Sequence, residues 1–391
     1  MFQVCILGGG ASGSILAINL AKKCIDVAVV DADEKPAKKL LVTGNGKCNL
    51  TNKNTSSKFY SCNLDRFFEK FSWRQTVQMF HDFGLLTYFD EQGRCYPTSN
   101  QAKSVCFVIQ KQFEKYHINF FANQNVVDVE FQNDFYVVKT DKQIFECKTL
   151  VFATGHNKHL LDISKKLGEK TLDFVPSLVA LKTKQNTKKL AGQRLSNVLV
   201  VGCCEDKKMI QFGEVLFKEN GLSGICIFDI SSIFAQKNKF FGKISIDLLP
   251  KIDIVDLQNV LKNNLSKFSN ILDLLQGLFS KQVAEQILLQ ANIPPETDCN
   301  NVKEETIFQI ANATKKLQFD VCGHHDNNQV CAGGILLQNL TECLESKVHK
   351  NLYFCGEICN AQGICGGYNL QWAFSSAMIV AQDILQKTKK T

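Results

Sequence analysis

Several features that mark whole classes of protein are rare or missing in this chain of 391 residues. It has six prolines and no low-complexity stretch, so we expect neither a disordered linker nor a fibrous architecture. No run approaches the roughly 18 consecutive apolar residues of a membrane-spanning helix, and we expect no membrane segment. An apolar run at residues 4–7 is typical of a buried strand and leaves no space for a cleaved leader. We therefore expect a cytoplasmic protein.

Arginine is scarce as well. Only Arg66, Arg74, Arg94 and Arg194 accompany the many lysines, although Lys and Arg together exceed Asp and Glu by 45 to 38. Arginine and clustered positive charge are the usual signs of a nucleic-acid-binding face. Because neither is present, the net charge of +7 indicates a solvated surface. We expect a small-molecule substrate and no nucleic-acid partner.

Cysteine, by contrast, is abundant, with 17 residues among 391. The number is odd, and the share lies below the roughly 8–10% of a disulfide scaffold, so we expect reduced thiols. Cys355, Cys359 and Cys365 are spaced unlike the C-x2-C pairs of most zinc and iron–sulfur sites. The sequence therefore predicts no metal site.

The opening of the chain has the pattern of a dinucleotide-binding turn. An apolar strand at residues 4–7 is followed by a glycine-rich turn, a helical pattern and a second apolar strand that ends in Asp31. In this G-x-G-x-x-G arrangement Gly8 permits a tight turn, Gly10 lets backbone N–H groups approach a pyrophosphate, and Gly13 allows close helix–strand packing. Asp31 can accept a hydrogen bond from a ribose hydroxyl, which favours FAD or NAD over NADP. This unit alone does not decide between FAD and NAD.

The next segment favours the longer cofactor. Residues 38–52 form a glycine-punctuated run of small hydrogen-bonding side chains directly after the ribose-binding acid. A nicotinamide-only domain would continue there with a helix and a strand. Such a loop can place backbone N–H groups and Asn and Thr side chains beside an extended cofactor. An ordinary surface loop is the alternative interpretation of the same residues.

Four motifs resemble those of bacterial and archaeal NAD(P)/FAD-dependent oxidoreductases, a family whose relatives include a proposed bile-acid-dehydroxylation flavoenzyme. The family pattern K-L-x-x-S/T-G-G-G-R-C-N-x-T-N resembles residues 39–52, and G-R-x-F/Y-P-x-S resembles residues 93–99. A third match covers residues 213–224. The fourth is Gly356-Glu357 followed by Gly363 and residues 366–371. With the opening turn, the matches cover essentially the whole chain.

The resemblance implies an α/β fold in which a Rossmann-like FAD-binding domain is interrupted by a β-rich insert, which itself carries a small helical domain. The FAD-binding domain is expected at residues 1–190 and 334–391. The β-rich insert is expected at residues 191–253 and 313–333. The helical domain is expected at residues 254–312, where leucines recur at intervals of three and four.

The resemblance also implies which residues hold FAD. Glu357 follows a strand and resembles the carboxylate that holds the flavin ribityl chain in related enzymes. The helix that begins after Gly366 and Gly367 would face the pyrimidine edge of the cofactor and stabilise negative charge there. The expected FAD-binding residues are Gly8, Gly10, Ala11, Ser12, Gly13, Asp31, Lys39, Thr43, Gly44, Gly46, Cys48, Asn49, Thr51, Val126, Thr154, Gly155, Gly356, Glu357, Gly366, Gly367, Tyr368, Asn369 and Leu370.

The expected function is an FAD-dependent oxidoreductase that reduces an unsaturated or carbonyl-conjugated small molecule by hydride transfer through the flavin. The alternatives are an oxygen-using flavin oxidase or monooxygenase, and a redox-sensing or partner-binding flavoprotein without turnover. No second G-x-G-x-x-G follows a strand. NADH or NADPH would therefore act as a transient electron donor, or an electron-donor protein would take its place.

The catalytic residue is left unassigned. Cys48 is a candidate for a redox-active thiol, because the family pattern has a cysteine at this position. His156 and His159 are expected to face solvent. Asn360 and Gln362 stand where relatives have aspartates, and this departure counts against a carboxylate general acid at those positions.

Overall fold

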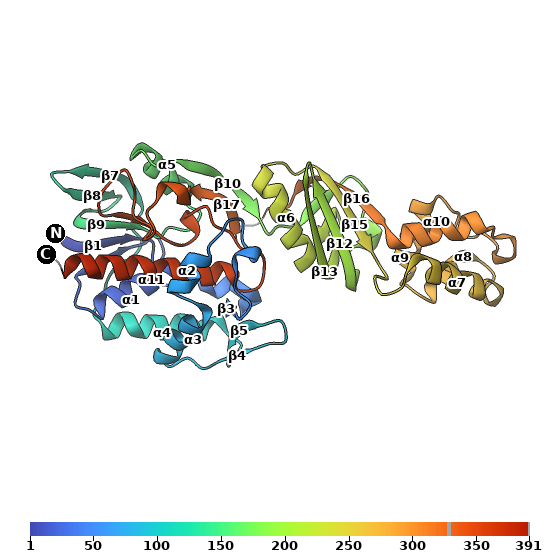
Figure 1. The fold of residues 1–391 in the computed structure, drawn as a ribbon, viewed down its shortest axis with the longest axis horizontal. Coiled ribbons are helices and arrows are strands. Elements are labelled where there is room, and N and C mark those ends of the chain that lie inside the picture. The colour runs from blue at the N-terminus through green and yellow to red at the C-terminus, as the bar shows by residue number, and fades with distance from the viewer. Residues whose placement is uncertain (327–329, 390–391) are drawn as a thin grey trace. The chain divides into compact units, whose positions relative to one another are not determined.

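A computed structural model describes residues 1–326 and 330–389 of the chain. The chain divides into two compact units (Figure 1). Unit 1 comprises Met1–Val175 and Gln329–Thr391, and unit 2 comprises Pro176–Asn328. The expected fold class, a Rossmann-like domain interrupted by a β-rich insert that carries helices, is confirmed by the arrangement of the strands in the two units.

Unit 1 is built on a seven-stranded sheet with the order β6-β2-β1-β9-β8-β7, in which β18 also pairs with β9. Strands β6, β2, β1, β9 and β18 run parallel, whereas β7, β8 and β9 form an antiparallel meander. The carboxyl ends of the parallel strands therefore meet along one edge, where α/β sheets bind their ligands. The strands are β1 (Phe2–Leu7), β2 (Val27–Val30), β6 (Asn119–Phe121), β7 (Val126–Gln132), β8 (Phe135–Thr140), β9 (Ile144–Phe152) and β18 (Leu352–Phe354).

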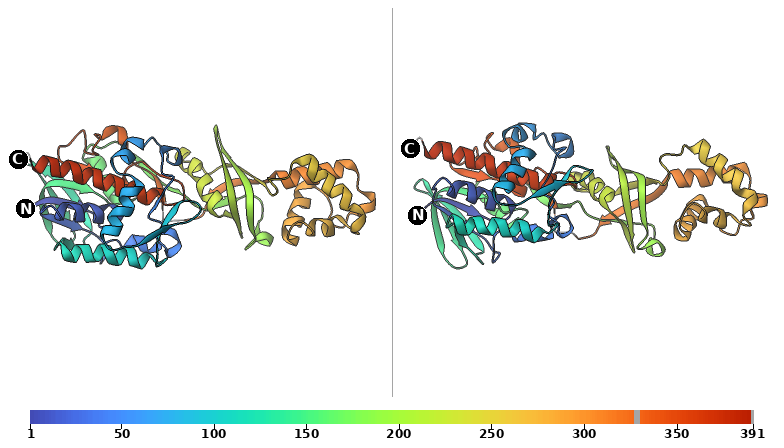
Figure 2. Two further views of the ribbon diagram at one scale, coloured as in Figure 1. Left: turned by 60° about the horizontal axis from the view of Figure 1, so that its bottom comes forward. Right: turned by 90° about the horizontal axis from the view of Figure 1, so that it is seen from below.

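The central strands of unit 1 are apolar on both faces. Residues 4–7 of β1 and 27–30 of β2 are all buried, as a parallel sheet covered by helices requires. Helices α1 (Ala11–Ala21) and α11 (Tyr368–Thr388) pack side by side although they lie at opposite ends of the chain (Figures 1 and 2). The other helices of this unit are α2 (Asp65–Lys70), α3 (Trp73–Asp82), α4 (Ala102–Lys115) and α5 (Lys158–Lys166).

Two smaller sheets complete unit 1. Strand β5 (Arg94–Pro97) pairs with β3 (Thr51–Asn52) on one side and β4 (Thr87–Phe89) on the other. Strand β10 (Thr171–Ser177), which ends just inside unit 2, pairs with β17 (Val330–Ile335). In the described part of the chain, no helix is both long enough and apolar enough to cross a bilayer.

Unit 2 contains a closed six-stranded barrel with the order β11-β14-β13-β12-β15-β16. Helix α6 (Ile225–Lys237) packs against the barrel, and four further helices share its hydrophobic core. Figure 2 shows these four helices gathered at one end of the barrel. The barrel strands are β11 (Leu181–Thr183), β12 (Arg194–Cys204), β13 (Lys207–Lys218), β14 (Gly221–Ser223), β15 (Gly242–Asp247) and β16 (Leu317–His324); the helices are α7 (Ile254–Asn264), α8 (Ile271–Gln276), α9 (Lys281–Ala291) and α10 (Glu304–Lys315).

The division of the chain differs from the expected boundaries on both sides of the insert. The sequence predicts that the FAD-binding domain resumes at residue 334, yet β17 already belongs to unit 1. The sequence placed residues up to 190 in the FAD-binding domain, yet β11 belongs to the barrel of unit 2. Leu181 pairs with Leu222 of β14 and with His324 of β16, both far away in sequence. Because this strand has three residues and its partners are distant, local composition carries no sign of it.

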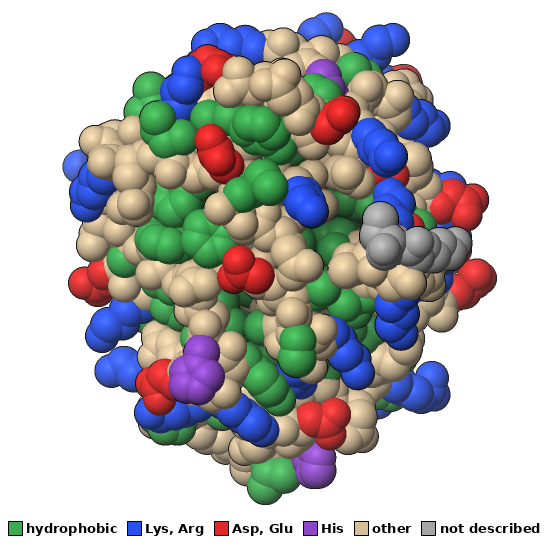
Figure 3. Space-filling model, turned by 90° about the vertical axis from the view of Figure 1, so that its left-hand side faces the viewer, with side chains coloured by type: hydrophobic (Ala, Val, Ile, Leu, Met, Phe, Trp, Pro, Cys, Tyr) green, Lys and Arg blue, Asp and Glu red, His purple; other side chains and the backbone are tan. Residues whose placement is uncertain are grey.

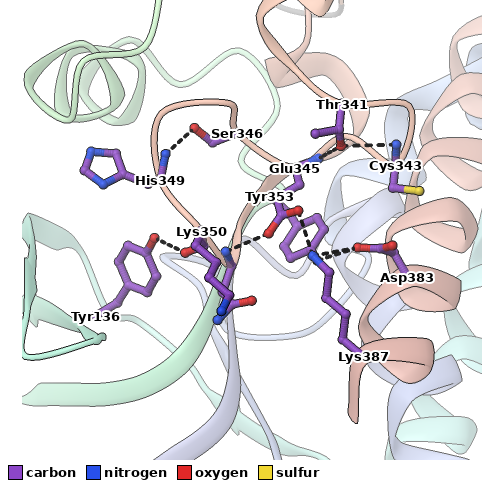
Figure 4. Close-up of polar contacts among 11 residues, drawn as sticks. Tyr136, Thr341, Cys343, Glu345, Ser346, His349, Lys350, Tyr353, Asp383 and Lys387 are labelled. Carbon is purple, nitrogen blue, oxygen red and sulfur yellow. Dashed lines mark hydrogen bonds and ion pairs between the residues drawn. The ribbon is translucent and has the colours of Figure 1, made fainter. Parts of the chain in front are cut away.

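The end of unit 1 where the strands begin and α11 ends is held by a polar network (Figure 4). Lys387 Nζ donates to Glu345 Oε2 and to Tyr353 Oη, each at 2.7 Å, and lies 3.1 Å from Asp383 Oδ2. Tyr353 Oη donates in turn to Asp383 Oδ2 at 2.6 Å. The loop before β18 is thereby attached to the last turns of α11. Around this network, side chains of both charges are scattered over the outer face of this end (Figure 3).

Candidate functional site

The glycine turn after β1 has the geometry that its spacing predicts. A Cβ at Gly13 would lie 1.8 Å from the carbonyl oxygen of Gly8, so only glycine lets α1 pack this closely on the turn. A Cβ at Gly10 would meet no heavy atom of the described residues within 4 Å. The backbone at Gly10 therefore faces open space at the first turn of α1, where a helix offers N–H groups and partial positive charge to a phosphate.

Asp31 stands at the end of β2 beside this turn. Its carboxylate accepts the backbone N–H of Gly9 and, at 2.8 Å, that of Asp33. Burial raises the pKa of Asp31, against the lowering effect of these two hydrogen bonds. The Asp31 carbonyl accepts the N–H of Gln124 at 2.9 Å, which brings the start of β7, with Val126, close to the same acid. Asp31 is thus fixed in position and can still accept from a ligand hydroxyl.

The loop at residues 38–52 meets the turn that starts α11. Asn52 Nδ2 donates to the carbonyl oxygen of Gly366 at 3.0 Å. A Cβ at Gly367 would lie 2.6 Å from the carbonyl oxygen of Thr51 and 2.7 Å from Asn49 Oδ1, and φ at Gly367 is +95°. Only glycine satisfies both the close approach and this dihedral angle. Segments that are more than 300 residues apart in sequence therefore form one wall.

Several buried polar atoms in this region have no hydrogen-bond partner within the described residues, and two of them belong to residues beside glycine turns. Asn49 Oδ1 and Thr154 Oγ1 accept or donate no hydrogen bond within the described residues. Both side chains are at most 7% exposed, so water does not readily take the place of a partner. Leaving a buried polar atom unsatisfied costs about 1–3 kcal/mol. Unpartnered atoms beside glycine turns are what a site for a polar ligand presents.

Glu357 lies in a short turn after β18 and is held at both carboxylate oxygens. Oε1 accepts the backbone N–H of Cys331 at 3.0 Å, and Oε2 lies 3.0 Å from His156 Nδ1. A Cβ at Gly155 would be 3.6 Å from Glu357 Oε2 and 3.8 Å from Lys39 Nζ. The structure therefore brings Lys39, Gly155 and Glu357 together, as the expected site requires.

His156 departs from the expectation that it faces solvent. Its side chain is 23% exposed and is paired with Glu357. In the sequence, His156 directly follows the strand and the residues Thr154 and Gly155, which places it near the expected site. Its contact with Glu357 joins residues 201 positions apart, and no local pattern predicts it. His159 faces solvent as expected, although its Nε2 also lies 3.1 Å from the carbonyl oxygen of Val126.

The first turn of α11 is shaped by its own side chains. Asn369 Oδ1 accepts the N–H of Gly363 at 2.8 Å, and Asn369 Nδ2 donates to the Gly363 carbonyl at 3.0 Å. This pair closes the loop that precedes the helix. Tyr368 stacks on Phe59, with ring centroids 4.7 Å apart. The expected helix N-terminus is therefore a fixed feature of the site.

Other expected cofactor residues have structural duties. Thr51 Oγ1 donates to Gln371 Oε1 at 2.5 Å, and Thr76 Oγ1 donates to the same oxygen at 2.9 Å. Thr43 Oγ1 donates to the Leu40 carbonyl at 2.7 Å. These side chains hold the loop in place, so Thr43 and Thr51 would contact a ligand through their backbone groups. Two of the remaining expected residues, Gly44 and Gly46, lie in the same loop, whereas Ala11 begins α1 and Leu370 lies in the first turn of α11. Gly356 approaches α1 closely, because a Cβ there would lie 2.5 Å from Ser12 Oγ.

The structure speaks against Cys48 as a redox-active thiol. Its side chain is fully buried. Burial raises the pKa of Cys48 to about 12, so almost no thiolate is present at neutral pH. In the described part of the chain, no three His, Cys, Asp or Glu side chains gather as they would around a metal ion.

The comparison with protein families covers nearly the whole chain. The model of the HI0933-like protein Rossmann domain matches residues 2–383. The chain belongs to the HI0933-like family. This membership confirms the expected family of flavin-dependent oxidoreductases.

Relatives with an assigned activity match this chain over nearly the whole length of both proteins. The 3-dehydro-bile acid delta(4,6)-reductase of Clostridium scindens is 29% identical, over 98% of both chains. The ribosomal RNA dihydrouridine synthase of Haemophilus influenzae is 25% identical, over 97% of both chains. Among solved structures, 3-ketosteroid delta1-dehydrogenase from Sterolibacterium denitrificans has a TM-score of 0.50 at 10% identity over 99% of each chain, a likeness of fold alone.

Proposed function

We propose that the protein binds FAD along the carboxyl edge of the unit 1 sheet and uses it to reduce a carbon–carbon double bond conjugated to a carbonyl group. The observation that carries this proposal is that two buried oxygens without partners among the described residues, Asn49 Oδ1 and Thr154 Oγ1, belong to residues that each lie beside a glycine turn. The donors, turns and acids present there fit a flavin dinucleotide.

Each part of the site suits one part of that cofactor. Asp31 would accept from the adenosine ribose, with Val126 nearby. The first turn of α1, with Gly10, Ala11 and Ser12, would hold the pyrophosphate. Glu357 would accept from the ribityl chain, next to Lys39 and Gly155. The remaining expected residues, in the 39–51 loop and residues 366–370, would surround the flavin ring.

The reaction is supported by what two relatives share. A 3-dehydro steroid with delta(4,6) double bonds and a uridine base both contain a double bond conjugated to a carbonyl, and both named activities concern its reduction. When bound, FAD supplies the hydride. The chain would orient the substrate, and the N-terminus of α11 would stabilise negative charge at the pyrimidine edge.

Reduction of the double bond by a hydride also requires a proton, and two polar residues of the loop before α11 cannot supply it. Asn360 and Gln362 are amides and cannot donate a proton as an acid at neutral pH. Asn360 Oδ1 accepts the N–H of Gly333 at 3.3 Å, which is a structural duty. We propose that bound water or a substrate-borne group completes this step. NADH or NADPH would bind transiently and supply the electrons, and an electron-donor protein is the alternative source.

Anaerobic mixing tests this function. The purified protein is titrated with NADH and with NADPH while the flavin absorbance is followed, and a conjugated enone is then added. Bleaching by either donor followed by recovery of the flavin on addition of the enone supports the proposal. Bleaching followed by recovery with oxygen alone favours an oxidase or monooxygenase. If neither donor bleaches the flavin, reduction with dithionite before enone addition separates a reductase served by a donor protein from a flavoprotein without turnover.

A further inference from the structure

The motif at residues 93–99 has no part in the site described above. Its arginine, Arg94, lies in β5 and pairs with Asn52 of β3 in an antiparallel register. Residues that face each other across such a pair project to the same face of the sheet. Asn52 is the residue whose side chain binds the Gly366 carbonyl at the start of α11. Arg94 therefore lies one strand away from the turn proposed to hold the flavin ring.

The approach of this hairpin to the turn is close. A Cβ at Gly93 would lie 2.9 Å from Asn52 Oδ1 and 2.8 Å from Lys53 Cγ. The φ of +77° at Gly93 also requires glycine. The start of β5 is thus fixed against Asn52, and the position of Arg94 relative to the α11 turn is set by the fold.

The orientation of the guanidinium is fixed by one carboxylate. Arg94 Nε donates to Asp90 Oδ2 at 2.7 Å. Asp90 Oδ1 accepts the backbone N–H groups of Gln92 and Arg94 at 3.0 and 2.9 Å, so the carboxylate itself cannot turn away. The ion pair is partly shielded, with the two side chains 26% and 23% exposed. The side chain is therefore held before any ligand arrives.

The far end of the same guanidinium forms no hydrogen bond or ion pair with the described residues, although its central carbon lies 6.0 Å from the centre of the Tyr96 ring. Within residues 1–326 and 330–389, Nη1 and Nη2 donate no hydrogen bond, and the only side-chain bond of Arg94 is the one from Nε. Two parallel N–H groups with fixed direction match the two oxygens of a carboxylate or phosphate. The structure thus offers a prearranged receptor for an anion next to the proposed flavin turn.

We propose that Arg94 binds an anionic group, a carboxylate or a phosphate, on the substrate whose double bond is reduced. This inference rests on the proposed function and narrows its substrate class to conjugated carbonyl compounds that carry a negative charge. Asp90 acts as the positioning residue. A charge-assisted, bidentate contact contributes about 1.5–3 kcal/mol, so the charged compound should bind about tenfold to a hundredfold more tightly than its neutral counterpart.

Binding of two matched pairs of compounds to the flavin-loaded protein tests the inference without turnover. One pair is a 3-oxo-delta-4 steroid acid and its methyl ester, and the other is uridine 5′-monophosphate and uridine. Dissociation constants are measured by calorimetry for the wild type, Arg94→Met and Arg94→Lys. Arg66→Met is the matched control, because Arg66 is a half-exposed arginine on α2 whose nearest acid, Glu342, is 3.9 Å away.

We expect the wild type to prefer the charged member of at least one pair, Arg94→Met to abolish that preference, and Arg66→Met to keep it. Arg94→Lys should retain part of it, since charge remains but the fork is lost. A preference confined to the steroid pair identifies a carboxylate, and one confined to the uridine pair identifies a phosphate. Equal binding within both pairs, no binding of either anion, or an unchanged preference in Arg94→Met overturns the inference. A protein that shows the Arg94-dependent preference but reduces no enone contradicts the proposed function alone.

Discussion

The two ends of the unit 1 sheet differ in whether their polar groups have partners. At the end where the strands begin, Lys387, Glu345, Asp383 and Tyr353 satisfy one another (Figure 4). At the end where they finish, glycines take the place of side chains, and buried oxygens find no partner among residues 1–326 and 330–389. A satisfied polar network adds stability, whereas an unsatisfied one reserves its hydrogen bonds for a ligand. The comparison therefore separates residues that hold the fold from residues that we propose to contact a cofactor.

The largest expected difference between supporting residues and proposed ligand-binding residues lies within one turn, the glycine turn after β1. Gly13→Ala should cost at least about 3 kcal/mol of unfolding free energy, because its Cβ would lie 1.8 Å from a carbonyl oxygen. Gly10→Val should leave the fold intact and weaken FAD binding, since its side chain enters the open space proposed for the pyrophosphate. Chemical denaturation and flavin content measure the two effects. A Gly10→Val protein with full FAD occupancy would count against the assigned turn.

A second change addresses the opposite end of the sheet. Lys387→Met removes the cation shared by Glu345 and Asp383, whose side chains are only 15% and 16% exposed. We expect a loss of about 1–2 kcal/mol, below the value for a fully buried pair because Lys387 is partly exposed. The dissociation constant for FAD should not change. An altered FAD affinity would show that this end also serves the ligand.

Glu357→Gln should have the reverse profile. The amide can still accept a ribityl hydroxyl through one oxygen, but the charge that pairs with His156 is lost. We expect FAD affinity to fall about tenfold, with thermal stability of the FAD-free protein nearly unchanged. Fluorescence titration with FAD gives the first quantity. Undiminished affinity would remove Glu357 from the proposed ribityl contact.

The smallest expected effect concerns Glu169, a carboxylate that lacks a full set of partners among the described residues at the end of the sheet where the strands begin. Glu169 is buried, accepts from Ser346 Oγ through Oε1, and has no partner for Oε2 within the described residues. Burial raises the pKa of Glu169 above its usual value of 4.5, so the folded state binds a proton more readily than the unfolded state. Stability from this group is therefore greatest at low pH and declines as pH rises from 4.5 through the raised pKa.

Glu169→Gln should remove that decline and raise the unfolding free energy at neutral pH by at most about 1 kcal/mol. Denaturation curves of both proteins at several pH values measure the difference. If the variant and the wild type show the same slope of stability with pH above 4.5, the assignment of a raised pKa is wrong.

Much of unit 1 could be predicted because its signals are local. The glycine turn before α1 and the glycines before α11 are each specified by neighbouring residues. The pairing of β11 and the contact between His156 and Glu357 join residues far apart in sequence, and no local pattern encodes them. The same holds for Asn52, whose amide group binds the α11 turn although its motif marks only a loop.

The burial of Cys48 shows a different limit. Its motif position suggested chemistry, but reactivity depends on solvent exposure and neighbouring charge, which a motif does not contain. The motifs therefore predict at which end of the sheet the proposed ligand binds, whereas burial and hydrogen bonding decide which of their side chains support the fold.

The central claim is that the carboxyl edge of the unit 1 sheet holds one FAD. Heat denaturation of the purified, folded protein, followed by mass and absorbance analysis of the released small molecule, tests it most directly. We expect one FAD per chain, or stoichiometric uptake of added FAD by a preparation that lacks it. A correctly folded protein that releases no flavin and takes up none would contradict the claim.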